Sequence, residues 1–152
     1  MAEKNNKAVN GYWPLDRSAY EIRRRELFPS TREAINHAVE LILGVARRCG
    51  CGSDQEADLE IALREALANA VIHGNEEDAG KSVFVRCYGA DEKTLILVRD
   101  QGPGFEPKEI PDPRNKERLQ LDHGRGLFLM RALMDRVEYR KDGREVLLFK
   151  RW

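Results

Sequence analysis

The chain has 152 residues, of which 41% are hydrophobic and 34% charged, a composition typical of one folded globular domain. Its 26 basic and 26 acidic residues cancel, so no overall field favours nucleic acid or an anionic membrane as a partner. No apolar run approaches the roughly 20 residues needed to cross a bilayer, and the N-terminal segment lacks the apolar stretch of a signal peptide. We therefore expect a cytoplasmic protein. The three cysteines lack zinc-site spacing and are expected to be free thiols.

The N-terminal part of the chain predicts an arm and then an edge strand. Residues 1–17 are polar and aperiodic, and we expect an arm that is disordered or docks on a neighbour, ahead of one domain over 18–152. Residues 20–28 have strand-like ends around three consecutive arginines. This composition predicts a strand at the solvent-facing edge of a sheet.

Two amphipathic helices are predicted next. A Ser-x-x-Glu capping box begins at Ser30, apolar residues then recur with a 3.6-residue period, and Gly50 is placed to end the helix. A second capping box begins at Ser53 and opens a helix that runs to Gly74.

Two strands and a long irregular segment follow. Residues 82–88 and 94–100 are predicted to form adjacent antiparallel strands joined by the polar turn 89–93. Residues 101–125 contain several Gly and Pro residues and little regular pattern. A segment of that length inside a compact domain is usually a functional lid or a disordered stretch, and we expect a lid.

The last part of the chain predicts a short buried helix over 126–134 and a hairpin of strands 136–140 and 144–150. The predicted order is therefore strand, two helices, two strands, lid, helix and two strands. The fold class that this order favours is α+β, a two-layer α/β sandwich in which a mostly antiparallel sheet carries helices on one face.

Three motifs carry candidate chemistry. In the first, Glu65, Asn69 and His73 follow one another at four-residue spacing on the second helix, at the border of its apolar face. A carboxylate there can orient a nucleophile or accept its proton, and an amide oxygen suits Mg²⁺, which takes its other ligands from phosphates and water. A solvated polar stripe would have the same spacing.

The second motif is Asp100, Gly102 and Gly104, at the end of a predicted strand. Glycines let the backbone come close to a planar ligand, and the carboxylate can accept a hydrogen bond from an exocyclic amine such as that of adenine. An ordinary Gly-Pro turn is the alternative.

The third motif is the run His123, Gly124, Arg125, Gly126 and Leu127, at the start of the predicted third helix. Backbone N–H groups at a helix N-terminus, aided by an arginine, can hold phosphate oxygens. A flexible hinge before the helix is the alternative. Neither a P-loop nor a Rossmann glycine motif is present, so a nucleotide would need a different cradle.

Taken in order, with the long segment between the last two, these motifs resemble those of the ATPase superfamily of gyrase, MutL and histidine kinases, which binds ATP in a Bergerat fold. The residues that match its N box and its two glycine boxes are Glu65, Asn69, Asp100, Gly102, Gly104, Gly124 and Gly126. The E-A-x-x-N-A-x-x-H-G form of the helix motif and the run G-R-G-L-F-L-M-R-A-L-M-D most resemble the anti-sigma-factor serine kinases. The resemblance covers about residues 20–151.

The resemblance implies a role for each matched side chain. Asn69 is expected to hold Mg²⁺, Glu65 to activate the attacking hydroxyl, and Asp100 to bind adenine. Gly104 is expected to let the base approach, and Arg125 with the amides near position 126 to hold phosphates. The other nucleotide-binding residues that it implies are His73, Gly102, Gly124, Gly126 and Leu127.

The resemblance also implies partners. Kinases of this kind bind a sigma factor, phosphorylate a serine on an anti-sigma-factor antagonist, and commonly form homodimers, with no direct contact to nucleic acid or membrane. Residues 145–149 lack the threonine that often orders water near the adenine in relatives, which predicts weaker nucleotide affinity. A non-catalytic ATP-binding anti-sigma or signalling adaptor is the main alternative. The catalytic part of a histidine kinase is a third, disfavoured because the chain has no room for a phosphoacceptor domain.

Overall fold

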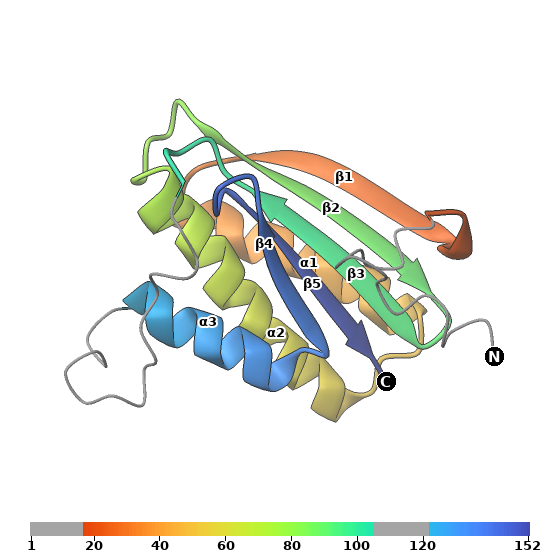
Figure 1. Ribbon diagram of the computed structural model, residues 1–152. Coiled ribbons are helices and arrows are strands. Elements are labelled where there is room, and N and C mark those ends of the chain that lie inside the picture. Colours follow the sequence, from red (N-terminus) through yellow and green to blue (C-terminus); the bar gives the residue numbers. More distant parts are fainter. Residues whose placement is uncertain (1–16, 105–121) are drawn as a thin grey trace.

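The computed structural model describes residues 17–104 and 122–152, which form one antiparallel sheet with helices on one of its faces (Figure 1). The strand order is β1-β2-β3-β5-β4. In chain order the elements are η3 (Arg17–Ala19), β1 (Ile22–Pro29), α1 (Arg32–Arg48), α2 (Ser53–Ala68), η4 (Asn69–Gly74), β2 (Ser82–Ala90), β3 (Lys93–Arg99), α3 (Asp122–Leu133), β4 (Arg136–Arg140) and β5 (Glu145–Arg151). The predicted fold class and element order are confirmed, including β1 at the sheet edge. The expected N-terminal arm and residues 105–121 of the expected lid lie outside the described residues.

The first predicted capping box is displaced by one residue. Thr31, not Ser30, caps α1, and its hydroxyl oxygen accepts a hydrogen bond from the Ala34 backbone N–H at 3.3 Å. Ser30 is fully buried and its hydroxyl donates to the carbonyl of Val71 at 3.5 Å, so a tertiary contact takes the side chain that the pattern favoured as the cap. Gly50 follows the last turn with a φ of 90°, the left-handed conformation expected of a helix-ending glycine.

The second helix changes geometry before it ends. Gly52 is the N-cap of α2 and Ser53 is its first residue, without a side-chain cap, so the second capping box was wrong. From Asn69 to Gly74 the chain continues as a π-helical turn, η4. Such wider turns are frequent at functional sites because they redirect side chains that regular α-helical spacing would align.

The hairpins differ from the prediction mainly at their turns. β2 and β3 pair as far as Ala90 and Lys93, so only two residues make the turn where five were expected. One of them, Glu92, has a φ of 61°. The β4–β5 turn contains Asp142 and Gly143, as predicted, and β5 lies between β3 and β4 in the sheet.

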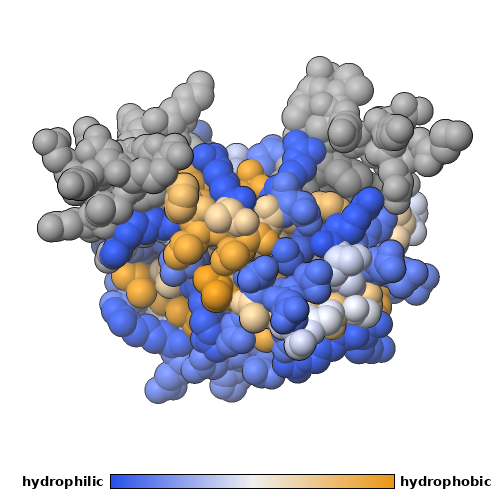
Figure 2. All heavy atoms as spheres, turned by 90° about the horizontal axis from the view of Figure 1, so that it is seen from below, coloured by the Kyte–Doolittle hydropathy of each residue, from blue (hydrophilic) through white to orange (hydrophobic). Residues whose placement is uncertain are grey.

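The third helix is longer and less buried than predicted. It begins at Asp122, four residues before the expected start, because residues 122–125 already have helical backbone. Met130 and Met134 are buried, but Phe128 and Leu129 are 44% and 37% exposed. α3 lies along α2 at the outer edge of the helical layer, and the view from below shows an area of apolar surface next to hydrophilic surface (Figures 1 and 2).

The main core lies between the helices and the sheet. Alternate residues of the central strands point into it and pack on the apolar faces of α1 and α2. Its fully buried members include Val39, Ile42, Leu59, Leu63, Val85, Ile96 and Leu148. Burial of each such side chain contributes about 1.5–3 kcal/mol to folding. The cysteines are free thiols, as predicted, and within the described parts of the chain no helix is long and apolar enough to cross a membrane.

Candidate functional site

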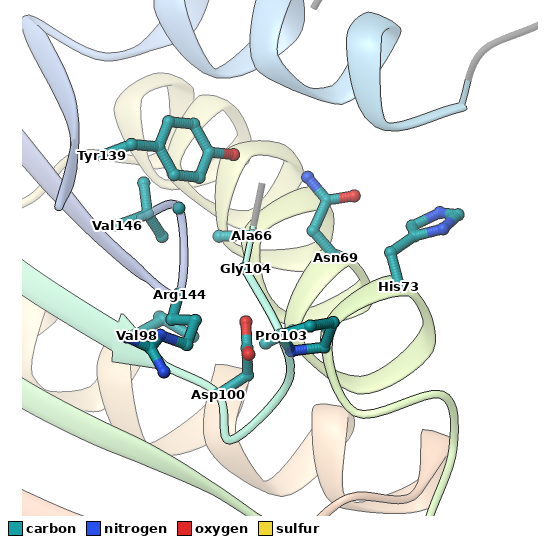
Figure 3. A pocket seen from close by; sticks show the side chains of 13 residues that line it. Ala66, Asn69, His73, Val98, Asp100, Pro103, Gly104, Tyr139, Arg144 and Val146 are labelled. Carbon is teal, nitrogen blue, oxygen red and sulfur yellow. The ribbon is translucent and has the colours of Figure 1, made fainter. Parts of the chain in front are cut away.

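A cavity of about 260 Å³ lies between the end of α2, the end of β3 and the β4–β5 hairpin (Figure 3). Its walls are mostly apolar, with polar groups at a few points. The lining residues are Ala66, Asn69, Ala70, His73 and Gly74 from α2 and η4, Val98, Asp100, Pro103 and Gly104 from β3 and the following loop, and Tyr139, Gly143, Arg144 and Val146 from the hairpin. Asn69, His73, Asp100 and Gly104 were therefore brought together as the motifs implied.

Asp100 is the carboxylate at the base of this cavity. Its backbone N–H donates to the carbonyl of Arg144 at 2.9 Å, which holds it where β3 ends. Its Oδ1 accepts from the backbone N–H of Gly102 at 2.8 Å, while Val98 and Val146 form apolar walls beside it. Burial raises the pKa of Asp100, and the hydrogen bond from Gly102 works in the opposite direction. A half-buried acceptor with apolar walls suits the amine edge of a planar base.

Two glycines allow the close packing that places this carboxylate. A Cβ on Gly102 would lie 1.9 Å from the carbonyl oxygen of Gly74, and a Cβ on Gly74 would lie 2.4 Å from Asp100 Oδ2. Real Cβ atoms do not approach so closely, so any side chain at either position would push η4 away from the loop after β3. Gly74 and Gly102 thus act by letting two protein segments meet.

Gly104 packs in the same way against the β4–β5 turn. Its φ is 82°, and a Cβ there would lie 2.2 Å from the carbonyl oxygen of Asp142. The expected role of Gly104 was to let the base approach. A Cβ there would meet protein backbone, although Gly104 also lines the cavity.

Asn75 joins the same three segments and was missed by the sequence reasoning. It is fully buried; its Nδ2 donates to the carbonyl of Ser82 at 3.0 Å, and its Oδ1 accepts from the backbone N–H of Gln101 at 2.8 Å. One amide therefore ties the end of η4 to the start of β2 and the end of β3. An Asn after a helix-ending glycine gives no sequence signal for this role.

Tyr139, from β4, was also missed. Its ring lines the cavity directly across from Val146 in the β4–β5 register, and its hydroxyl is hydrogen-bonded to the Asn69 side chain. Figure 3 shows the hydroxyl pointing to the amide nitrogen of Asn69, with the amide oxygen turned the other way. Burial raises the pKa of Tyr139 to about 12, so the hydroxyl is neutral at physiological pH.

Glu65 and Asn69 meet the third helix at Gly126. A Cβ on Gly126 would lie 2.8 Å from Glu65 Oε2 and 3.3 Å from Asn69 Nδ2, so the backbone of α3 passes directly over both side chains. Both are half-buried, and Glu65 stands one turn before Asn69, outside the cavity lining. The first motif and the third are therefore adjacent in space.

The other described residues of the third motif lie in the first turn of α3 or in the main core. Gly124 and Arg125 lie in the first turn of α3, and Arg125 is exposed. Leu127 is 5% exposed and its side chain belongs to the main core, so it is not placed to contact a ligand through that side chain. The side chains of residues 122–124, His123 included, lie outside the described part of the structure. The first-turn N–H groups of α3 have no acceptors within the helix and remain the candidate anion site.

The side chains that could hold a metal ion at this site fit Mg²⁺ bound together with phosphate. Within the described residues no cluster of three or more His, Cys, Asp or Glu side chains could hold a metal ion by itself. Asn69 presents a neutral amide oxygen beside the Glu65 carboxylate and the start of α3. This arrangement fits Mg²⁺ only where phosphate oxygens and water complete its shell, because Mg²⁺ commonly takes few protein ligands.

Comparison with known proteins agrees with this geometry. Residues 28–150 match the model of the histidine kinase-like ATPase domain. The chain belongs to the histidine kinase-like ATPase family. It is 31% identical over 125 residues to the serine-protein kinase RsbW of Halalkalibacterium halodurans, a match that covers 78% of this chain and 76% of the relative. The kinases of the same name from Bacillus mycoides and Bacillus subtilis are 37% and 34% identical, over 70% and 62% of this chain and 71% and 62% of theirs. The family resemblance inferred from the three motifs is confirmed.

Proposed function

We propose that this chain is an ATP-dependent protein serine/threonine kinase that acts as an anti-sigma regulatory factor. Its membership of the ATPase family and its similarity to serine-protein kinases support the activity. The observation that carries the mechanism is the meeting of Glu65, Asn69 and Gly126 beside a cavity whose other end holds Asp100. Asp100 inside the cavity and Glu65 beside it would provide separate groups for base recognition and for phosphoryl transfer.

Asp100 and the apolar walls would bind the adenine. The carboxylate would accept a hydrogen bond from the exocyclic amine, while Val98, Val146 and the ring of Tyr139 would cover the faces and edge of the base. Residues 145–149, which include Val146, carry no threonine where relatives often have one. The Tyr139 hydroxyl, which comes from the neighbouring strand, contacts Asn69.

Asn69 and the start of α3 would hold the phosphate end. Mg²⁺, when bound, neutralises charge on the phosphate oxygens. The amide oxygen of Asn69 would be its protein ligand, and Tyr139 would fix that oxygen's direction by holding the amide nitrogen. Arg125 and the first-turn N–H groups of α3 would hold phosphate oxygens.

Glu65 would act on the protein substrate. Its carboxylate would orient the serine hydroxyl toward the γ-phosphorus and accept the hydroxyl proton. The serine oxygen forms the new bond to phosphorus, the bond from that phosphorus to the bridging oxygen breaks, and ADP leaves. A site that only held ATP would not need this carboxylate beside Asn69.

The partners are part of the proposal. By analogy with anti-sigma-factor kinases, the chain would bind a sigma factor, phosphorylate a serine on an antagonist protein, and work as a homodimer in the cytoplasm. Binding of the sigma factor and phosphorylation of the antagonist follow from the resemblance. Sedimentation of the purified chain tests whether it forms a homodimer.

The experiment is transfer of labelled γ-phosphate from ATP to each candidate antagonist encoded in the same genome. The kinase proposal expects label on a serine of one antagonist, dependent on Mg²⁺, with a matched antagonist whose serine is replaced by alanine as control. Tight ATP binding without transfer to any candidate would support the adaptor function instead. No ATP binding would reject the proposed site itself.

A further inference from the structure

The face of the sheet opposite the helices is rich in arginine. No helix of the described residues covers this face, as Figure 1 shows. The strand registers place its cations in rows across the sheet: Arg23, Arg25, Arg86, Lys93, Arg99, Arg136, Arg140 and Arg151. Glu138 and Glu145 are the carboxylates in the same rows. Because the whole chain is neutral, this is a local excess of positive charge.

The arginines of the helical layer do not produce a comparable excess of positive charge. Three of them donate to carboxylates of the same layer or the loop beside it: Arg32 to Glu77, Arg47 to Glu56 and Arg64 to Glu60. On the sheet face, Arg86 and Arg99 lie over the ring of Phe84, with guanidinium carbons 5.0 and 4.8 Å from its centroid. Arg99 also pairs with Glu145 at 3.6 Å, and Arg140 pairs with Glu138 at 3.1 Å. A guanidinium stacked on a ring keeps N–H donors for an external acceptor.

Arg25 and Arg86 show this excess of positive charge most clearly. They are direct cross-strand partners, an arrangement in which like charges destabilise the sheet. The contacts between described residues give neither of them a carboxylate partner, and the Nε of Arg86 is buried without a hydrogen-bond acceptor. Arginine on an edge strand protects it from unwanted pairing, which would explain Arg25. It does not explain Arg86, which lies one strand further in.

The same residues line a hollow of about 290 Å³ at the β1 edge, formed by Arg23, Arg24, Arg25, Arg86 and Tyr88. We propose that this hollow and the edge of β1 bind an acidic extended segment of a partner protein, whose carboxylates meet Arg25 and Arg86. β1 is the outermost strand of the sheet that the described residues form, so its outer edge can offer backbone groups to such a segment, and the arginines select its charge.

Two other occupants fit less well. Nucleic acid bases need free aromatic faces for stacking, but Phe84 is covered by two guanidinium groups and Tyr88 is 8% exposed and packs on Tyr20. A second copy of this chain placed against the β1 edge in the same way would set arginine against arginine. The proposal here does not depend on the kinase activity.

The test uses the full chain and a fluorescent synthetic peptide of alternating Glu and Val, measured by anisotropy at low and high salt. We expect binding that weakens with salt, and a loss of at least about tenfold in affinity in the double variant Arg25→Gln, Arg86→Gln. Arg64→Gln, which removes an exposed arginine of the helical layer, is the matched control and should bind like wild type. Unchanged Mg·ATP binding shows that both variants are folded.

Several results would overturn the proposal. They are absence of peptide binding, equal binding of a peptide with Lys in place of Glu, and equal loss of affinity in Arg64→Gln. Displacement of the peptide by a single-stranded oligonucleotide of equal charge and at equal concentration would indicate a general polyanion site. A dimer that dissociates in the Arg25→Gln, Arg86→Gln variant would identify the second copy as the occupant.

Discussion

Replacing Gly126 with alanine should disturb the chemistry of the site while leaving the fold intact. The new Cβ would lie 2.8 Å from Glu65 Oε2 and 3.3 Å from Asn69 Nδ2. Both atoms are ends of side chains, so they rather than the backbone of α3 would move. Ordinary van der Waals contact begins near 3.4 Å, and the Glu65 carboxylate must therefore shift by roughly half an ångström.

The size of the effect follows from that shift. Because misplacement of a reacting group by about 1 Å can cost roughly a hundredfold in rate, half of it predicts about tenfold slower phosphoryl transfer. Gly44 provides the matched control, since it also lies in a helix and a Cβ there would meet nothing within 4 Å. Gly44→Ala should raise the free energy of unfolding by about 0.5–1 kcal/mol without changing the transfer rate. Gly126→Ala should change it by less than about 1 kcal/mol.

The assay pairs chemical denaturation with single-turnover transfer of labelled phosphate at saturating Mg·ATP. The expected outcome separates the two variants, because neither is much destabilised and the transfer rate falls in Gly126→Ala alone. A wild-type transfer rate in Gly126→Ala would refute the reasoning, because it would mean that the contact of α3 with Glu65 and Asn69 does not affect the reaction.

Further expectations concern base recognition, metal use and pH. Asp100→Ala should lower the preference for ATP over GTP by about 1–3 kcal/mol, measured by competition, and equal competition against wild type would show that Asp100 does not bind the base. Tyr139→Phe should raise the Mg²⁺ concentration needed for tight ATP binding in calorimetry, with ATP affinity in EDTA low and unchanged; identical Mg²⁺ titrations would exclude a positioning role. Burial raises the pKa of Asp100, and the ionised carboxylate is the stronger acceptor. ATP affinity should therefore be complete above that raised pKa and fall as the pH drops through it, and Asp100→Asn should lose this dependence.

Much of the fold was predictable because hydrophobic period distinguishes helix from strand along most of this chain. The order of elements and the edge position of β1 were read from apolar spacing and from the three arginines of that strand. The place of β5 between β3 and β4 could not be read from the sequence, because hairpin signals specify only which strands follow one another along the chain. Ser30 was assigned as a cap because local pattern cannot reveal its burial against Val71.

The site was predictable to the extent that its residues form motifs. Glu65, Asn69 and Asp100 were identified because a carboxylate or an amide at those positions has a chemical use and a recognisable spacing. The π-helical turn Asn69–Gly74 could not be predicted, since it breaks the spacing on which the helix prediction rests. Asn75 and Tyr139 contribute through distances to other segments, and no pattern within their own segments signals those distances.

The glycines also show that a sequence motif does not reveal the distances between segments. Their positions marked the two glycine boxes, but their neighbours in the structure are protein atoms: the Gly74 carbonyl for Gly102, the Asp142 carbonyl for Gly104, and the Glu65 carboxylate for Gly126. The sequence therefore predicted where glycine is needed but did not reveal these protein neighbours. Only tertiary distances distinguish space for a ligand from space for another segment.

In the proposed mechanism Glu65 acts on the incoming hydroxyl, at a site whose nucleotide binding does not depend on it. The most direct measurement is the single-turnover rate of phosphate transfer from Mg·ATP to the antagonist by wild type and Glu65→Gln, with ATP affinity measured on the same samples. We expect Glu65→Gln largely to keep ATP affinity, because glutamine preserves the shape of the side chain, and to slow transfer by roughly a hundredfold or more. Transfer by Glu65→Gln at the wild-type rate would show that Glu65 does not act on the hydroxyl.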